Sequence, residues 1–417
     1  MTSALDLFVE EARAVTIAEA APRLGLKFSG KRQEHPGPCP HCGGTDTFAF
    51  NTAKNKWNCR AGGIGGQDAI GMAAHVLGLD QRSAFLDACS AVSGLPIPDE
   101  GRSETAEERS AREARLSDQK RRNEAEAARR ATAQNAFRER ERATALSILK
   151  AGMSLRSLPA GGMVGTYLRG RGAGVPQADW LRIHPNLPYF HGEDELGHPR
   201  AIWTGPAMVA AFLAADNTVL GCHITWIDVD AGTKLRPILH DPETGEVLPT
   251  KKMRGTKKGG FIPLSGSRSA ERWLGGEGIE NTLAAALAEG IRTDTFYFAA
   301  GDLGNLAGSA DPASQFCHPT LTRTDKLGRV KPVMVAGPAP KPDQADDDAF
   351  LLPAHVTELM LLADGDSEPV MTASAMARAK ARLRRPGLLT AIAWPKPGRD
   401  FAEMMATAHA QTEPALS

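Results

Sequence analysis

The sequence lacks the features that would place a chain in a membrane or outside the cell. Its 417 residues contain no apolar run of about 18 residues, the length from which a membrane-spanning helix is suspected. No secretory leader is recognisable at the start. Six cysteines in a chain of this length are too few for a secreted disulfide framework. We therefore expect a cytoplasmic protein without membrane contact.

Two sources of nucleotide chemistry are missing as well. No G-x-x-x-x-G-K-[ST] loop occurs, so the chain has no motor ATPase of its own. Only three tyrosines are present, Tyr167, Tyr189 and Tyr297, and none lies in the domain context of a tyrosine nucleophile. The net charge is +0, with 49 basic and 49 acidic residues, so contact with nucleic acid would require local basic patches.

The few cysteines include a metal-binding pattern. Cys39 and Cys42 form a C-x-x-C that is followed by Gly43-Gly44, which favours a tight turn, and Cys59 ends a short strand that contains Trp57. This spacing predicts a small ribbon of antiparallel strands in which the cysteine thiolates bind Zn²⁺ tetrahedrally. Three ligands leave a tetrahedral site incomplete, so a fourth side chain is needed.

The segments TDTFAFN, WNCR and GGQDAIGMAAHVLG closely resemble the zinc-binding domain of phage and plasmid primases. That family usually has its fourth ligand three residues after the third, where this chain has Gly62. We expect His35, four residues before Cys39, to replace it. His41 is badly placed between the knuckle cysteines, and His75 on the following helix is a more distant option. A degenerate ribbon without metal is the alternative.

The resemblance implies that this domain helps to recognise a single-stranded template. Trp57 is one of several aromatic and basic residues on the small sheet, a composition that suits stacking on bases and contact with phosphates. Some of these aromatics must instead form the core of the domain, and we expect Phe48 to be one of them.

An acidic pattern in the second half of the chain organises the rest. Glu277-Gly278 follows a short apolar strand and precedes a helix. A second apolar strand, 359–363, ends in Asp364-Gly365-Asp366, where alternate side chains point the same way. Asp400 precedes a further helix. Crowded carboxylates repel one another unless a cation lies among them, and Mg²⁺ prefers such hard oxygen ligands.

This order of strand–Glu-Gly–helix, strand–Asp-x-Asp and Gly-x-Asp–helix resembles the Toprim domain of bacterial-type primases, topoisomerases and some nucleases. The resemblance implies that Glu277, Asp364, Asp366 and Asp400 are the catalytic acids. It also implies that Glu277, Asp364 and Asp366 bind Mg²⁺ or Mn²⁺, with Glu277 as a ligand or as the general acid/base. The fold class that it implies is α/β, with a mostly parallel sheet flanked by helices.

Basic residues precede the acidic region. Tyr167-Leu-Arg-Gly-Arg-Gly resembles the start of the primase catalytic core, and its bases are Arg169 and Arg171. A denser basic segment then leads into the strand before the acids. We expect this segment to contact template or nucleotide phosphates. Its charged members are Lys251, Lys252, Arg254, Lys257 and Lys258.

Four segments are expected from these patterns. The run between the ribbon and the basic region is rich in Ala, Glu and Arg with opposite charges at helical spacing, which predicts an exposed helical spacer. Its Arg-rich face could instead lie against nucleic acid or a partner. The segments are a zinc ribbon (1–98), a charged helical linker (99–150), a mixed α+β basic subdomain (151–268) and the Toprim domain (269–410).

The combined resemblance implies a DNA primase of phage, plasmid or integrated-element type. Such an enzyme joins ribonucleoside triphosphates into short primers on single-stranded DNA, holds a structural Zn²⁺ and works beside a separate helicase. Two alternatives stay open. A Toprim nuclease would use the same acids, and a non-catalytic module would only bind single-stranded nucleic acid.

Overall fold

The computed structural model describes residues 4–27, 33–98, 105–176, 178–324, 329–345 and 348–412. The chain divides into two compact units, Met1–Asn135 with Arg323–Lys331, and Ala136–Thr322 with Pro332–Ser417. The four-segment division expected from the sequence stays a prediction. Among the helices described, none combines the length and the apolar character needed to cross a lipid bilayer.

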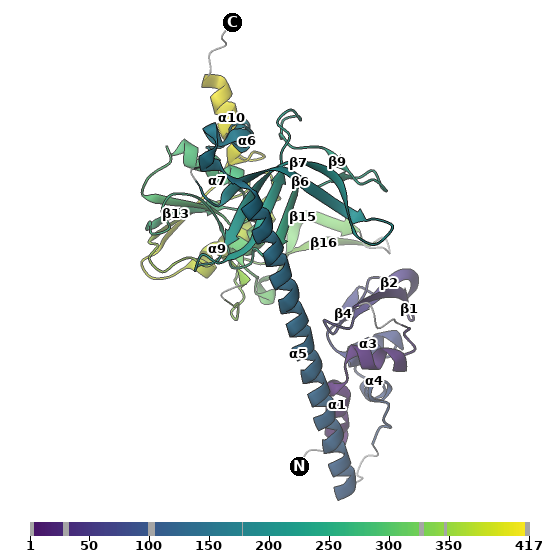
Figure 1. The fold of residues 1–417 in the computed structure, drawn as a ribbon. Coiled ribbons are helices and arrows are strands. Elements are labelled where there is room, and N and C mark those ends of the chain that lie inside the picture. Colours follow the sequence, from purple (N-terminus) through teal and green to yellow (C-terminus); the bar gives the residue numbers. More distant parts are fainter. Residues whose placement is uncertain are drawn as a thin grey trace. The chain divides into compact units, whose positions relative to one another are not determined.

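The first unit combines short helices with a small antiparallel sheet (Figure 1). The strands of this sheet lie in the order β1-β2-β3-β4. A capping box between Thr16 and Glu19 starts α2, and the Asp68 side chain caps α3. The elements are α1 (Ala4–Ala14), α2 (Ile17–Arg23), β1 (Glu34–Cys39), β2 (Gly43–Asn51), β3 (Lys56–Cys59), β4 (Ile64–Gly66), α3 (Ala69–Val76) and α4 (Phe85–Ser93). The antiparallel strands expected around Phe48 and Trp57 are confirmed.

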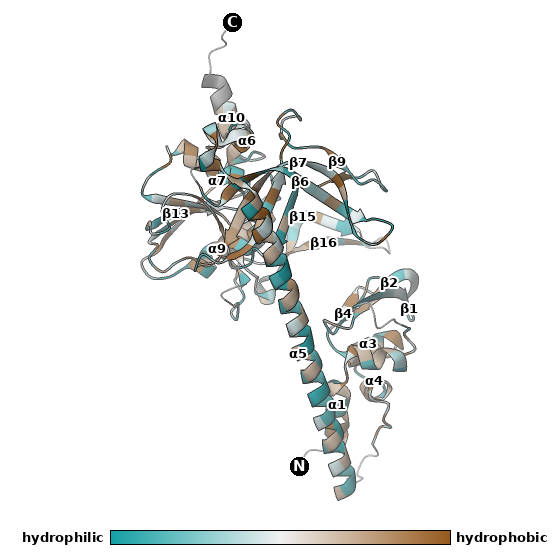
Figure 2. Cartoon of the chain, viewed as in Figure 1, coloured by the Kyte–Doolittle hydropathy of each residue, from teal (hydrophilic) through white to brown (hydrophobic). Residues whose placement is uncertain are grey.

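The charged segment forms one helix, α5 (Ala106–Ala151), as the opposite charges at helical spacing predict. Figure 2 shows hydrophilic and weakly hydrophobic residues along most of its length. Near its C-terminal end, Ala145 and Leu149 are buried in a core of the second unit. The helix therefore begins in one compact unit and ends in the other.

An antiparallel sheet forms the first half of the second unit, in the order β11-β8-β7-β6-β5. Its strands are β5 (Met153–Ser154), β6 (Leu181–Glu193), β7 (Pro199–Leu213), β8 (Val219–Trp226) and β11 (Lys251–Gly255). Short elements flank it: η1 (Leu155–Ser157), η2 (Pro159–Gly161), α6 (Gly162–Gly170) and the β9 (Leu239–His240) and β10 (Val247–Leu248) pair. The mixed α+β character expected here is confirmed.

A second sheet follows, in the order β12-β14-β13-β17-β18. Its strands are β12 (Ile262–Ser265), β13 (Arg272–Gly276), β14 (Thr295–Ala299), β17 (Glu358–Leu362) and β18 (Leu389–Ala393). All but the edge strand β12 pair in parallel, so the mostly parallel α/β sheet is confirmed. The other elements of this part are α7 (Ile279–Ala288), α8 (Leu303–Ala307), η3 (Pro312–Ser314), β15 (Phe316–Thr324), β16 (Val330–Val335), α9 (Pro369–Leu383) and α10 (Phe401–Thr412).

Two apolar cores hold the parallel sheet in place. One contains Tyr167 and Leu168 of α6 together with Leu283 of α7, so it joins the two halves of the unit. The other packs Trp273 and Phe298 under α9. The bridge between Leu213 and Phe261 also connects the two sheets. Tyr167 of α6 and Lys251 of β11 both contact Glu280 in the first turn of α7, so α6 and β11 lie near the carboxyl end of β13.

Candidate metal centre and acidic site

The first candidate site is a Cys/His cluster in the small ribbon. Ligand atoms of Cys39, Cys42, Cys59 and His75 all lie within 4.8 Å of one another. The His75 Nε2 atom is 3.3 Å from Cys39 Sγ and 3.7 Å from Cys42 Sγ. Three thiols and one imidazole arranged in this way could hold a metal ion such as zinc.

His75, not His35, completes the cluster, and the prediction of His35 was wrong. Four residues of extended strand separate His35 from Cys39, which is about 13 Å at the usual rise of a strand. His35 is instead 8% exposed, and its ring lies 5.0 Å from that of Phe50 on the neighbouring strand. The ligand from α3 comes from a segment that only folding brings near the ribbon.

Gly62 leaves the space that the His75 ring occupies. A Cβ atom at Gly62 would lie 2.9 Å from His75 Cε1 and 3.4 Å from Cys42 Sγ. A cysteine at position 62 would therefore compete with His75 for the same place. The backbone N–H of Gly62 donates a hydrogen bond to Cys59 Sγ at 3.3 Å. The backbone N–H of Cys42 donates in the same way to Cys39 Sγ at 3.2 Å.

The electrostatics of this cluster favour a bound cation. Burial and the neighbouring thiols of Cys39 and Cys59 raise the pKa of Cys42 to about 11. Burial, followed by the charge of His41, lowers the pKa of His75, which keeps the imidazole neutral. A cation would relieve the repulsion between thiolates, and a neutral imidazole is the form that ligates metal.

Trp57 belongs to the core of this unit rather than to its surface. The side chain is 4% exposed and its ring stacks on His75, with 5.3 Å between the ring centroids. A base cannot stack on a ring that is covered in this way, so the expected role of Trp57 in binding nucleic acid is not supported. Phe48, at 2% exposed, is buried as predicted.

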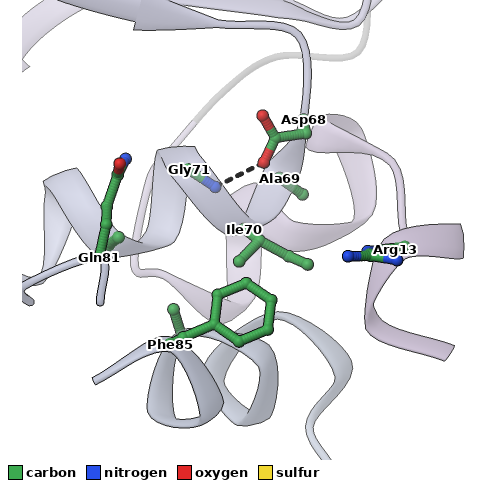
Figure 3. A pocket seen from close by; sticks show the side chains of 9 residues that line it. Arg13, Asp68, Ala69, Ile70, Gly71, Gln81 and Phe85 are labelled. Atoms are coloured by element: carbon green, nitrogen blue, oxygen red, sulfur yellow. Dashed lines mark hydrogen bonds between the residues drawn. The ribbon is translucent and has the colours of Figure 1, made fainter. Parts of the chain in front are cut away.

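A cavity of about 500 Å³ also lies in the first unit, at the N-terminal end of α3 (Figure 3). Ile70 and the Phe85 ring line it, and Arg13 lies to one side. Asp68 beside it accepts a hydrogen bond from the Gly71 N–H at 2.6 Å, which is its role as a helix cap. The lining contains none of the four metal-cluster residues.

The second candidate site is acidic and lies in the second unit. Gly276 pairs with Leu362, so Glu277 and Asp364 follow adjacent parallel strands at the same sheet edge. Leu362 in turn pairs with Ala393 of β18, after which the chain reaches Asp400 at the start of α10. The carboxyl ends of parallel strands meet at one edge, which is the usual place for a site in such sheets.

These acids perturb one another. Burial raises the pKa of Glu277 to about 7, and the charges of Asp364, Asp302 and Asp366 add to this rise. Burial also raises the pKa of Asp364, assisted by Asp366 and Asp400 and opposed by a hydrogen bond from Ser367. The pKa of Asp400 is raised as well, mainly by burial. The sheet edge thus concentrates negative charge.

The acids are neighbours without being in ligand contact. In the described part of the chain, no three of these acids have ligand atoms within 4.8 Å of one another, whereas the four residues of the Cys/His cluster do. Asp302 follows β14 and belongs with these acids, because its charge acts on Glu277. Its neighbour Gly301 donates an N–H to the Glu277 carbonyl at 2.9 Å.

Asn281 on α7 is a further residue of this site. Its Nδ2 donates to Asp364 Oδ1 at 3.4 Å, and its Oδ1 accepts the Ala402 N–H at 3.2 Å. One side chain of α7 thereby links the end of β17 to the start of α10. The Glu403 N–H donates to Asp400 Oδ1 at 2.6 Å, which fixes Asp400 as the cap of α10.

The two arginines after Tyr167 differ in position. Arg169 is exposed and donates to the Ala160 carbonyl at 3.0 Å. The charge of Arg171 lowers the pKa of Asp400, so it lies on the acidic side. A Cβ atom at Gly172 would lie 2.4 Å from the Ala402 carbonyl oxygen, so this glycine permits close packing on α10. Only Arg171 is therefore brought to the acids.

All five charges of the basic segment have partners within the second unit. Lys252 lies over the Tyr189 ring, 3.7 Å from its centroid. The others pair with carboxylates: Lys251 with Glu280 (2.8 Å), Arg254 with Glu141 (3.6 Å), Lys257 with Asp302, and Lys258 with Asp348 (3.3 Å). Lys251 and Lys257 thus lie beside the acidic edge, whereas Lys252 and Arg254 are engaged elsewhere.

Glu280 is the most deeply placed acid of this region. It is 6% exposed, accepts a hydrogen bond from Tyr167 Oη at 2.6 Å, and pairs with Lys251. Burial raises the pKa of Glu280, but the Lys251 ammonium and the hydrogen bonds outweigh burial and lower it below the usual range. An ionised carboxylate on α7 therefore connects α6 and β11 to the acidic site.

Comparison with known proteins adds one match. A family model described as a domain of unknown function (DUF7146) matches residues 139–264, which cover the end of α5 and the antiparallel sheet. No curated protein and no solved structure matches the chain. The acids at the sheet edge and the Cys/His cluster lie outside the matched residues.

Proposed function

We propose that this chain is a bacterial-type DNA primase that joins ribonucleoside triphosphates into short primers on single-stranded DNA. The observation that carries the proposal is that Glu277, Asp364 and Asp400 lie at the carboxyl edge of a mostly parallel sheet, which supports the resemblance to a Toprim domain. The Cys/His ribbon earlier in the chain supports a primase over a nuclease, which has no need of one.

Divalent cation binding follows from the charge of the edge. Asp364 and Asp366 would hold Mg²⁺ or Mn²⁺, with Asp400 close by and water and substrate phosphates filling the remaining positions. The cation would neutralise charge that develops on the phosphoryl oxygens. Its binding would draw the carboxylates closer than their mutual repulsion allows.

Glu277 is suited to act as the general base of the reaction, which accepts a proton from the attacking hydroxyl. Its pKa of about 7 lets it accept a proton at neutral pH from the hydroxyl that attacks the α-phosphorus of the next triphosphate. The new P–O bond forms as the bond to the bridging oxygen breaks, and pyrophosphate leaves. Arg171, Lys251 and Lys257 border the same edge and would offset the charge of the triphosphate.

The ribbon unit would contribute template binding, with Zn²⁺ held by Cys39, Cys42, Cys59 and His75 as a structural ion. A structural zinc can supply on the order of 10 kcal/mol to the folding of so small a module. Because no phosphate-loop motif occurs in the sequence, strand separation would fall to a separate helicase.

Primer synthesis tests the proposal. The full chain is incubated with single-stranded DNA, four ribonucleoside triphosphates and Mg²⁺ or Mn²⁺, beside Asp364→Asn and a matched control, Asp343→Asn, at an exposed position. We expect short labelled oligonucleotides from the wild type and the control, and none from Asp364→Asn. Cleaved template without primers would favour a nuclease, and binding without either reaction would favour a non-catalytic module.

A further inference from the structure

A cavity of about 480 Å³ lies in the second unit, and Lys251 of the basic segment is one of its lining residues. One wall is the loop 231–238 and the other is the segment 247–251, which includes β10 and the start of β11. The β9–β10 pair holds these walls together, with Leu239 opposite Leu248. Cavities of this size accommodate one small ligand.

The lining of this cavity is cationic. Lys234, Arg236 and Lys251 contribute to it, and no Asp or Glu does. The Arg236 Nε atom is buried without a hydrogen-bond partner. In the described part of the chain, neither Lys234 nor Arg236 forms an ion pair, whereas four charges of the basic segment do: Lys251, Arg254, Lys257 and Lys258. Buried donors without partners cost free energy that an anionic ligand would recover.

Apolar side chains stand next to these charges. Ile238 is 72% exposed and Val247 is 68% exposed, and both line the cavity together with Pro237 and Pro249. Exposed apolar side chains that gather at a concave site indicate a ligand-binding surface. A ligand that satisfies both features has a flat apolar part and several negative charges.

Lys251 connects the cavity to the acids. It lines the cavity, pairs with Glu280 at 2.8 Å, and its charge lowers the pKa of Glu277. A ligand whose phosphates reach Lys251 would therefore present them toward the sheet edge where Glu277 lies.

We propose that this cavity binds a nucleoside triphosphate, with the base against Ile238 and Val247 and the phosphates toward Lys234, Arg236 and Lys251. The proposal rests on the proposed function, since it names a subsite for the nucleotide that the reaction consumes. The convergence of three cations on one cavity next to the acids favours a free triphosphate over an extended strand.

Binding of a fluorescent ATP analogue to the full chain tests this assignment. The variants Lys234→Glu and Ile238→Glu change exposed side chains of the cavity, and Lys150→Glu and Leu196→Glu are matched controls at exposed positions of the same unit. We expect each cavity variant to weaken binding about tenfold, which corresponds to about 1.4 kcal/mol, and each control to bind as the wild type does. A labelled single-stranded oligonucleotide is measured in parallel.

Weaker ATP binding in both cavity variants, with unchanged controls, supports the proposal. Unchanged ATP affinity overturns it, and if only oligonucleotide binding falls, the cavity is a strand groove instead. A wild-type chain that does not bind the analogue also overturns it. Primer synthesis by the wild type is scored separately, so a chain that binds ATP here but makes no primers would contradict the proposed function alone.

Discussion

At the scale of single residues, Glu277 has the most consequential environment. Its pKa in the folded chain is about 7, above the value of 4.5 that applies when it is unfolded. Below pH 4.5 this difference has no effect on stability. Between pH 4.5 and 7 the unfolded chain loses the proton first, so the folded state is progressively penalised, and above pH 7 the penalty is complete.

We therefore predict that Glu277→Gln stabilises the second unit above pH 7 in magnesium-free buffer. A pKa difference of this size changes the free energy of unfolding by about 3 kcal/mol. For a unit of this size, that corresponds to roughly 6–12 °C in Tm. Thermal unfolding of wild type and variant between pH 5.5 and 8.5 measures it. A Tm difference that does not grow with pH would contradict the raised pKa.

The metal cluster gives a second prediction at this scale. His75→Ala should lower the zinc content of the purified chain and destabilise the ribbon, because it removes one of four ligands. His35→Ala should keep the metal, since His35 packs on Phe50 outside the cluster. Elemental analysis of the zinc content of both variants shows which histidine is the fourth ligand. Loss of metal only from His35→Ala would contradict the assignment of His75.

The site residues differ in how far the sequence could predict them. Glu277 and Asp364 end strands, so strand periodicity and chain order are enough to bring them to one edge. His75 could not be ranked first, because its helix returns to the ribbon only through tertiary packing. The one sequence feature pointing to it is Gly62, which marks both the missing ligand and the space for the imidazole ring.

At the scale of elements, the hydrogen bond and ion pair at Glu280 hold α6, α7 and β11 together. Glu280→Gln should destabilise the second unit by about 3 kcal/mol, because it leaves the Lys251 charge partly buried without its partner. Tyr167→Phe should cost about 1.5 kcal/mol, the value of a hydrogen bond to a charged group.

A double-mutant cycle tests this connection. The double variant Tyr167→Phe/Glu280→Gln should cost about 1 kcal/mol less than the sum of the single changes in denaturant unfolding. The control is the double variant Tyr167→Phe/Tyr297→Phe, whose costs should add, because the Tyr297 hydroxyl donates to a different carboxylate, Glu289. Full additivity at Tyr167 and Glu280 would show that the contact contributes nothing.

Elements were predicted better than their contacts. The helix at Ala106–Ala151 and the strands that precede Glu277 and Asp364 follow from charge spacing and apolar runs. The partners of the basic segment do not, because ion pairs such as Lys258–Asp348 join residues 90 positions apart. The same limit hid the cavity around Arg236, because its two walls come together through the β9–β10 pair.

At the scale of the whole molecule, the proposed function divides between the units: the chemistry belongs to the second unit and template binding to the ribbon. The family model matches only residues 139–264, so it does not cover the acids or the Cys/His cluster. The assignment therefore depends on the chemistry of the acidic edge and the ribbon, and on the order of these parts along the chain.

The most direct test of the central claim is template-directed synthesis on single-stranded homopolymers. With labelled ATP and Mg²⁺, the full chain should make short oligonucleotides on a deoxythymidine template and none on a deoxyadenosine template, and Asp364→Asn should make none on either. Labelled product that forms equally on both templates, or template cleavage without any product, would contradict the proposal that the chain is a primase.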